Sequence, residues 1–117
     1  MHEFSIAESL MEIVLEEATK HRASKILRVK IRAGKLMGIV PDLLTFAFKS
    51  LSEETIAEGA ELEIEEIPFQ GKCRNCGFFF SIGDFFGICP QCGSDNLEIE
   101  GGNDLELVGL EIERSEN

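Results

Sequence analysis

All four cysteines of the chain fall in two short corners of identical spacing. The corners read C-R-N-C-G at 73–77 and C-P-Q-C-G at 89–93. Two residues between a pair of thiols allow both sulfurs to face one ion, and a glycine after the pair permits a tight turn that points amides at the sulfurs. The spacing therefore predicts a closed tetrahedral metal site built from Cys73, Cys76, Cys89 and Cys92.

Zinc is the expected metal of this site, because thiolate ligands select zinc or iron and nothing in the sequence marks a redox role. A rubredoxin-like iron site, disulfides and free thiols remain as alternatives. A closed shell of four thiolates has no open position, so it usually builds structure and does no chemistry. Candidate chemistry must be sought elsewhere in the chain.

The first three residues, Met1, His2 and Glu3, offer a second set of donors. The α-amine of Met1 and the backbone nitrogen and Nδ1 of His2 can chelate one ion in fused rings. The backbone nitrogen of Glu3 completes a square plane. Four nitrogens in a plane are typical of Ni(II) or Cu(II), whereas zinc prefers tetrahedral shells. We expect the Glu3 carboxylate to add an axial oxygen or to accept a hydrogen bond from a ligand.

This spacing does not decide the matter alone, because a histidine at position 2 is more often an exposed terminal residue. Two observations favour the metal interpretation. The three residues are attached directly to an expected helix, and the sequence has only two histidines, no Ser-His-Asp set and no phosphate-binding loop. The other histidine, His21, fits an exposed helix end. The amine is available only where Met1 is retained, and the bulky His2 is expected to disfavour its removal.

The composition limits the classes of partner. The 22 Asp and Glu residues against 11 Lys and Arg give a formal charge of −11. Many zinc ribbons bind nucleic acid, but a polyanion requires a basic surface. No run approaches the roughly 18 apolar residues that span a bilayer, and the amino terminus does not resemble a signal peptide. We therefore expect a cytoplasmic protein with no nucleic-acid or membrane partner, and cysteines spaced for metal agree with a reducing compartment.

Hydrophobic periodicity predicts two helices. The first runs from about Ser5 to Arg22, where Ser5 and Glu8 have the spacing of a capping box. The second opens at Pro41-Asp42 and runs to about Ile56. The residues that recur on the buried face of the first helix are Ile6, Leu10, Val14 and Ala18, and those of the second are Leu44, Phe48 and Leu51.

Three stretches alternate with the period of a half-buried strand, at 26–33, 61–67 and 105–113. In the first stretch, Leu27, Val29 and Ile31 are expected on the buried face. Gly109 is a candidate bulge in the last. These elements predict a small α+β fold in which two helices cover one face of a three-stranded sheet.

The cysteine corners interrupt this fold as an insertion before the last strand. The sequence predicts an α+β domain at 1–67 and 104–117 and a zinc-knuckle insert at 68–103. The insert is too short to bury a core, so its metal must supply of the order of 10 kcal/mol of folding free energy. It holds five of the nine phenylalanines. We expect some of them to pack beneath the metal and others to contact another chain; they are Phe78, Phe79, Phe80, Phe85 and Phe86.

Three segments together resemble the HypA/HybF family of nickel-insertion accessory proteins, which mature [NiFe]-hydrogenase. They are the M-H-E-F-S-I-A-E-S-L start at 1–10, the start of a strand at 59–64, and the two C-x-x-C-G corners. The resemblance covers essentially the whole chain, and the M-H-E start joined to the four-cysteine knuckle is specific. It implies a nickel domain, with nickel at His2 and the amino terminus, and a zinc domain inserted before the last strand. The implied structural zinc ligands are Cys73, Cys76, Cys89 and Cys92.

The resemblance also implies a function. The chain would be a metallochaperone, not an enzyme, that delivers Ni(II) to the precursor of the hydrogenase large subunit with a HypB-type GTPase. Some relatives also serve urease, and urease accessory proteins remain open as partners. We expect a monomer or a weak dimer. Two other classes are weighed against this one: a zinc-ribbon module that recruits a partner, and a rubredoxin-like iron electron carrier.

Overall fold

The computed structural model describes residues 2–68, 70–81, 87–100 and 104–114. The chain forms two compact units. The first, called the α+β unit, holds Met1–Arg32, Ile39–Glu65 and Leu105–Asn117. The second, called the cysteine unit, holds Ala33–Gly38 and Glu66–Asp104.

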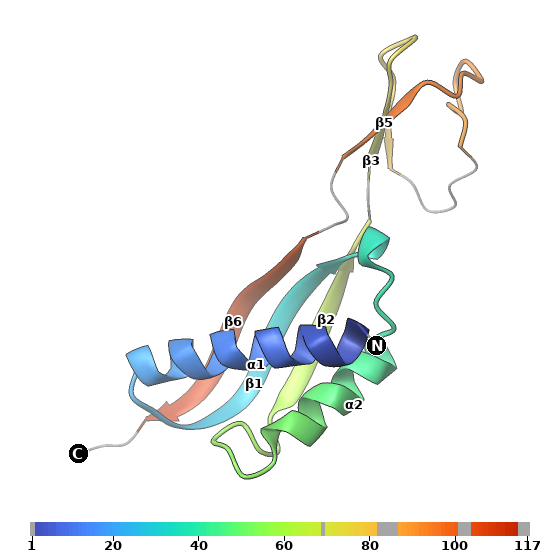
Figure 1. Ribbon diagram of the computed structural model, residues 1–117. Coiled ribbons are helices and arrows are strands. Elements are labelled where there is room, and N and C mark those ends of the chain that lie inside the picture. Colours follow the sequence, from blue (N-terminus) through green and yellow to red (C-terminus); the bar gives the residue numbers. More distant parts are fainter. Residues whose placement is uncertain (1, 69, 82–86, 101–103, 115–117) are drawn as a thin grey trace. The chain divides into compact units, whose positions relative to one another are not determined.

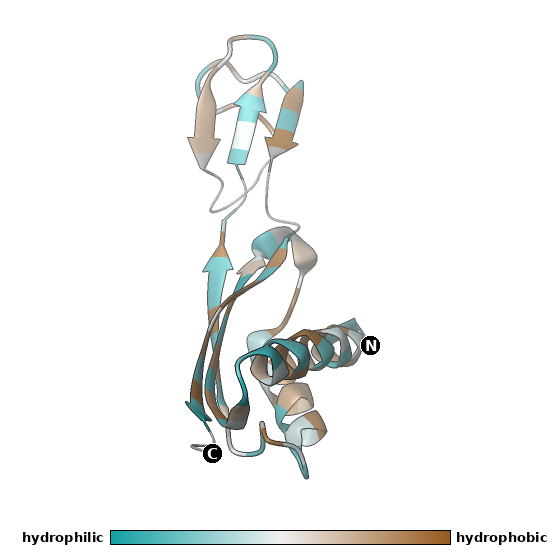
Figure 2. Cartoon of the chain, turned by 90° about the vertical axis from the view of Figure 1, so that its left-hand side faces the viewer, coloured by the Kyte–Doolittle hydropathy of each residue, from teal (hydrophilic) through white to brown (hydrophobic). Residues whose placement is uncertain are grey.

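The α+β unit is a three-stranded sheet with two helices on one side (Figures 1 and 2). Strand β1 lies between β2 and β6. The arrows of β1 and β2 point the same way in Figure 1, and β6 points the other way. Parallel neighbours need a crossover, which α2 provides. The expected fold class is confirmed by these elements: α1 (His2–Lys20), β1 (Ala23–Gly34), α2 (Pro41–Ser52), β2 (Glu61–Ile67) and β6 (Leu105–Arg114).

Helices and sheet share one hydrophobic core. The buried side chains of α1 recur at the spacing expected for one face of a helix, and α2 adds Leu44 and Phe48. Full burial of side chains of this size stabilises the fold by about 1.5–3 kcal/mol each. The fully buried side chains contributed by α1 and β1 are Ala7, Leu10, Val14, Ala18, Ile26, Val29 and Ile31.

Both helices differ from prediction at one end. Helix α1 begins at His2 instead of Ser5, so Ser5 is inside the helix and the capping-box interpretation is wrong. The acidic Glu3 lies in the first turn, where negative charge is favourable. Helix α2 ends at Ser52 instead of Ile56, because the hydroxyl of Thr55 donates to the carbonyl oxygen of Ser52 (2.7 Å) and the chain turns away.

The alternation in β1 changes phase near its start. Ile26 is fully buried and Leu27 is 38 % exposed, so the prediction that Leu27 faces the core is wrong. Val29 and Ile31 are buried as expected. A similar change of phase in β6 falls at Gly109 and Leu110, both half-buried, which fits the extra residue of a bulge.

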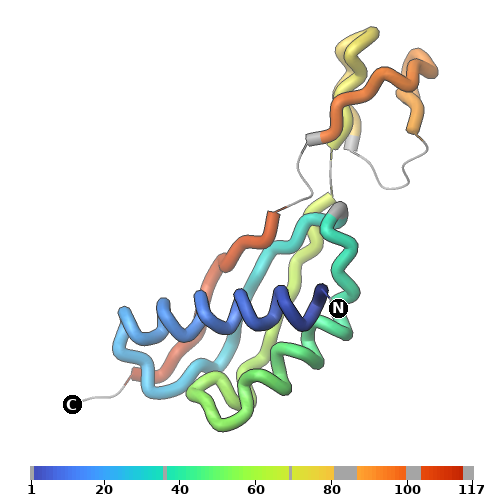
Figure 3. Tube along the Cα trace, viewed as in Figure 1, coloured from blue at the N-terminus to red at the C-terminus, as the bar shows by residue number. Residues whose placement is uncertain are grey.

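The cysteine unit has its own small sheet, which the sequence did not predict. Strand β3 (Gln70–Cys73) pairs antiparallel with β4 (Phe79–Ser81) on one side and with β5 (Leu97–Glu100) on the other. Figure 3 follows the trace of these three strands. The unit also holds a short 3-10 helix, η1 (Lys35–Met37).

The described phenylalanines of this unit are largely at its surface. Phe79 is 56 % exposed, and the ammonium of Lys72 lies over its ring, 5.3 Å from the centroid. Phe78, also exposed, stacks on Phe80 with 6.0 Å between ring centroids. The remaining two, at 85 and 86, lie outside the described residues.

Candidate metal centre

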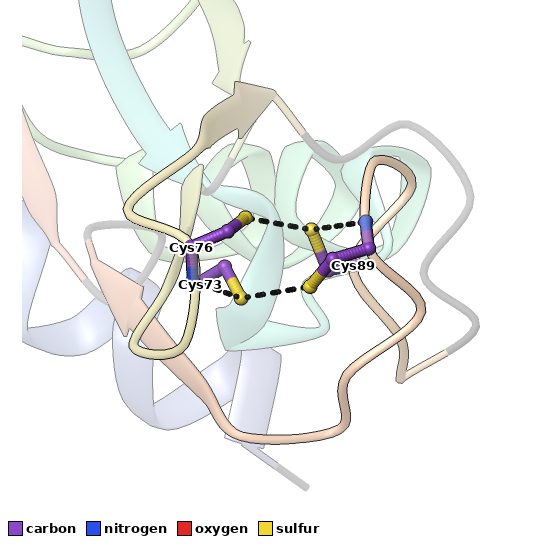
Figure 4. A group of neighbouring side chains, drawn as sticks. Cys73, Cys76 and Cys89 are labelled. Atoms are coloured by element: carbon purple, nitrogen blue, oxygen red, sulfur yellow. Dashed lines mark hydrogen bonds between the residues drawn. The ribbon is translucent and has the colours of Figure 1, made fainter.

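The four cysteine side chains converge on one point in the cysteine unit. All four sulfurs lie within 4.8 Å of one another. The sulfurs of Cys73 and Cys92 are 3.6 Å apart, and those of Cys76 and Cys89 are 3.7 Å apart. Figure 4 shows the side chains of Cys73 and Cys76 facing that of Cys89. The structure thus brings together the four residues that the spacing selected.

These distances fit a tetrahedral metal shell. A sulfur tetrahedron around an ion with bonds of about 2.3 Å has edges of about 3.8 Å, close to both of the short separations. A disulfide would need about 2.05 Å between sulfurs, and all four cysteines are free thiols. The set therefore suits a thiolate-preferring divalent metal, and the sulfur geometry suits zinc and iron alike.

Each corner is closed in the same way. The amide of Gly77 donates to the carbonyl oxygen of Cys73 at 2.8 Å, and the amide of Gly93 donates to that of Cys89 at 2.9 Å. Both glycines have φ of +77°, a conformation that a side chain disfavours. The turn aims backbone N–H groups at sulfur: that of Cys76 at Cys73 (3.4 Å) and that of Cys92 at Cys89 (3.5 Å).

The electrostatics of the cluster favour a bound cation. The amide of Cys76, followed by other donors, lowers the pKa of the Cys73 thiol to about 6. An amide from Phe78 acts to lower the pKa of Cys76, but desolvation and the neighbouring sulfurs outweigh it and raise that pKa to about 12. Four thiolates this close repel one another, and a divalent metal removes the repulsion.

The amino-terminal candidates lie at the start of α1 in the other unit. The side chain of His2 is 54 % exposed, whereas that of Glu3 is 14 % exposed. The Glu3 carboxylate has its Oε1 3.8 Å from Nδ1 of His2, and its Oε2 accepts a hydrogen bond from the amide of Val40 at 3.2 Å. That amide, followed by the backbone N–H of Glu3 itself, lowers the pKa of this carboxyl group. Met1 lies outside the described residues.

Sequence reasoning missed the role of Val40. Its amide donates a hydrogen bond to the Glu3 carboxylate, 37 residues away in the sequence, and no local sequence pattern predicts such a contact. Pro41 is a partial indication of this contact, because it marks the start of a helix whose first-turn amides have no acceptor within the helix. His21 is exposed, with Nε2 3.9 Å from a Glu17 carboxylate oxygen, as expected for a helix end.

Comparison with known proteins gives one consistent result. Residues 1–112 match the family model described as "Hydrogenase/urease nickel incorporation, metallochaperone, hypA". The hydrogenase maturation factor HypA of Geobacter metallireducens is 38 % identical over 113 residues, which is 97 % of this chain and 100 % of that protein. The protein of the same name from Nostoc punctiforme is 42 % identical over 113 residues, 97 % of this chain and 96 % of its own length.

Solved structures agree with the sequence comparison. The solution structure of the Ni metallochaperone HypA from Helicobacter pylori is 30 % identical, with a TM-score of 0.67 and coverage of 97 % of this chain and 98 % of that one. A second solution structure of a HypA protein is 32 % identical, with a TM-score of 0.70 and coverage of 98 % of both chains. In the described part of the chain, none of the helices has the length and apolar character needed to cross a membrane.

Proposed function

The chain belongs to the HypA family of nickel-incorporation metallochaperones and is thus a hydrogenase maturation factor, and from that premise we propose that it carries Ni(II) at its amino terminus. The donors are the α-amine of Met1, the backbone nitrogen and Nδ1 of His2, and the backbone nitrogen of Glu3. Nickel is the cargo, and the chain holds it for transfer without catalysing a reaction.

The placement of His2 supports this proposal. Its side chain is more than half exposed at the first turn of α1, where a second protein can reach it. The first four N–H groups of an α-helix have no acceptor within the helix, so nickel can displace the proton of the Glu3 amide and bind its nitrogen without breaking a helical hydrogen bond. The neighbouring Glu3 carboxylate is fixed by Val40 and faces Nδ1 of His2, where negative charge favours a bound cation.

The cysteine centre has the opposite character, and we propose that it holds structural zinc. Four thiolate ligands leave no coordination position for an incoming donor, whereas a transfer site needs one. Zinc bound by Cys73, Cys76, Cys89 and Cys92 would supply folding free energy to the cysteine unit and no reaction chemistry.

We propose the partners that the family implies. A HypB-type GTPase and the precursor of the hydrogenase large subunit would exchange nickel with this chain, and the family description extends to urease. The formal charge of −11 disfavours nucleic acid. We place the chain in the cytoplasm and propose that it acts as a monomer or a weak dimer.

The test is a nickel titration of untagged protein with metal analysis. The unmodified protein should bind one equivalent of nickel, and acetylation of the Met1 amine or His2→Ala should abolish it while zinc content stays unchanged. The exposed His21 lies on the same helix, so His21→Ala is the matched control and should bind nickel normally. Tight binding of one equivalent by the acetylated protein would refute the proposed site.

A further inference from the structure

A hollow of about 560 Å³ lies between α1 and the edge strand β6. It follows β6 over residues 107–114, and α1 lines its other side. Two large hydrophobic side chains are exposed in it: Ile13 of α1 is 47 % exposed, and Val108 of β6 is 40 % exposed. Half-buried residues of β6 supply the rest of its apolar lining: Leu107, Leu110 and Ile112. This surface is called the β6 hollow.

The backbone of β6 is paired on one side only. Among the strands of the described residues, its sole neighbour is β1. The carbonyl oxygen of Asp104 accepts from the amide of Gly34 at 2.9 Å, so it points toward β1. The carbonyl oxygen of Glu113 accepts from the hydroxyl of Ser24 at 3.1 Å and points the same way. Backbone groups alternate in direction along a strand, and the bulge at Gly109 shifts the phase by one residue. The residues whose N–H and C=O groups point to the free edge are therefore Leu105, Leu107, Leu110 and Ile112.

The two faces of β6 differ in charge. Its apolar side chains face the helices and the β6 hollow, and Figure 2 shows both helices on one side of the sheet. The exposed side chains on the other face are acidic, and one of them, Glu111, lies 3.8 Å from Arg28 of β1. The exposed acidic residues of β6 are Glu106, Glu111 and Glu113.

This charge disfavours a second copy of the chain at the β6 edge. Antiparallel pairing of β6 with itself would place the carboxylates of both copies on one face of a joined sheet. Like charges on neighbouring strands destabilise the pairing, whereas opposite charges stabilise it. The edge therefore suits a strand that carries basic side chains on that face.

The opposite edge of the sheet lacks this combination of features. Strand β2 is the other edge strand, and the hollow beside it has a volume of about 290 Å³ with Lys49 in its lining. The side chains of Leu62 and Ile64 in β2 pack against the core and are not among the exposed hydrophobic ones. The β6 edge is thus the better site for an amphipathic strand.

We propose that the β6 hollow accepts an extended segment of another protein, which adds to the sheet as a fourth strand. The side chains of the segment would alternate between apolar residues, which fill the hollow, and Lys or Arg residues, which pair with the glutamates of β6. The added strand would also satisfy the free N–H and C=O groups of the β6 edge. Docking at this edge uses neither the amino-terminal donors nor the cysteines, so the inference does not rest on the proposed function.

The probe is a capped peptide of alternating lysine and valine, as long as the stretch 107–114. It is titrated into the untagged, isotope-labelled full chain at low salt, up to about 1 mM, and followed by the backbone amide resonances. We expect shifts centred on β6 and its neighbour β1, and an affinity that falls as salt is added. A peptide of alternating glutamate and valine is the matched control and should not bind.

Methylated peptides test whether the backbone of the peptide pairs with β6. Alternate N–H groups of a strand point to opposite edges. Methylation of the valine nitrogens removes the N–H groups that face β6 in an antiparallel pairing, and methylation of the lysine nitrogens removes those that face it in a parallel one. One methylated peptide should therefore bind and the other should not. Equal affinities of the two would overturn strand addition.

Variants of the chain test whether the segment enters the hollow. Ile13→Lys places a charge in the β6 hollow and should weaken binding of the lysine–valine peptide about tenfold. Phe46→Lys is the matched control, because it makes the same change at an exposed site on α2 that does not line the hollow. It should bind the peptide as the unmodified chain does. Circular dichroism checks that both variants are folded.

Several results would overturn the proposal. They are absence of binding up to about 1 mM peptide, equal binding of the glutamate–valine peptide, shifts centred on β2, and equal affinities of Ile13→Lys and the unmodified chain. Sedimentation supplies a further one: a dimer of the unmodified chain that Ile13→Lys dissociates would show that a second copy occupies the hollow. None of these results affects the proposed nickel site, which the nickel titration tests separately.

Discussion

The α+β unit is held together by a hydrophobic core, whereas the described part of the cysteine unit buries very few hydrophobic side chains. In the first, twelve buried residues from α1, β1, α2 and the turn that follows α2 form one cluster. Among the described residues of the second, the fully buried hydrophobic side chains are Ala33, Cys73 and Cys89. A burial of this size cannot offset the conformational entropy of ordering the backbone. The difference teaches that one unit is folded by its core, whereas the proposed metal would have to supply the folding free energy of the other.

The same contrast separates the two proposed metal sites. The four sulfurs enclose a point from all sides, and two of the cysteines, Cys73 and Cys89, are themselves buried. The side chain of His2 is instead more than half exposed in the first turn of α1. A closed shell suits a metal that stays, and an open one suits a metal that leaves.

The largest expected effect comes from Cys76→Ala. Loss of one thiolate opens the shell, and the metal contributes of the order of 10 kcal/mol to the folding of such a unit. We expect bound zinc to disappear and the amides of β3, β4 and β5 to exchange hydrogen as in an unfolded chain. The measurement is metal analysis together with hydrogen exchange resolved by residue.

The α+β unit serves as the internal reference for that experiment. Its amides in α1, α2 and β1 should keep their protection in Cys76→Ala, because its core contains no cysteine. Loss of protection in both units at once would break the comparison and show that the two fold as one cooperative body.

The core of the α+β unit was predictable because its hydrophobic pattern is local. The period of α1 and the alternation of β2 are visible in the sequence, and the structure confirms both elements. The start of β1 was not predictable, since Ile26 and Leu27 are adjacent residues of equal hydrophobic character. Which of them faces the core depends on long-range pairing, such as the hydrogen bond from the amide of Ile26 to the carbonyl oxygen of Ile56 (2.9 Å).

This pair gives the second prediction. Ile26→Ala should reduce the free energy of unfolding of the α+β unit by about 2–5 kcal/mol, because it leaves a cavity in a packed core. Leu27→Ala should cost less than about 1 kcal/mol, since that side chain is 38 % exposed. The measurement is urea unfolding followed by circular dichroism. A larger cost for Leu27→Ala than for Ile26→Ala would restore the alternation read from the sequence.

The candidate sites were predictable to different degrees for the same reason. Two cysteines with two residues between them predict a metal-binding corner from the sequence alone, and the structure brings all four sulfurs together. The sheet of the cysteine unit escaped prediction because β3, β4 and β5 have three or four residues each, too few for periodicity to show. The contact between Glu3 and Val40 escaped because it joins two helix starts that only the tertiary fold brings together.

The smallest expected effect concerns this contact and varies with pH. The Val40 amide lowers the pKa of Glu3 from the ordinary 4.5 in the folded chain. A carboxyl group with a lowered folded pKa contributes stability above its unfolded pKa, and the contribution is lost as the pH falls through the folded value. Glu3→Gln should therefore be less stable than the unmodified, nickel-free protein at pH 7, and the two should converge as the pH falls below 4.5.

Urea unfolding across this pH range measures the convergence, and Glu8→Gln, an exposed site on the same helix, is the control. A constant difference between Glu3→Gln and the unmodified protein at every pH would mean that Glu3 acts through packing and not through its charge. Convergence would show that an ionised Glu3 ties the start of α1 to the start of α2. The contact between Glu3 and Val40 lies within the α+β unit, so it should persist unchanged in Cys76→Ala. The amino-terminal site would then keep its scaffold even when the cysteine unit has lost its metal.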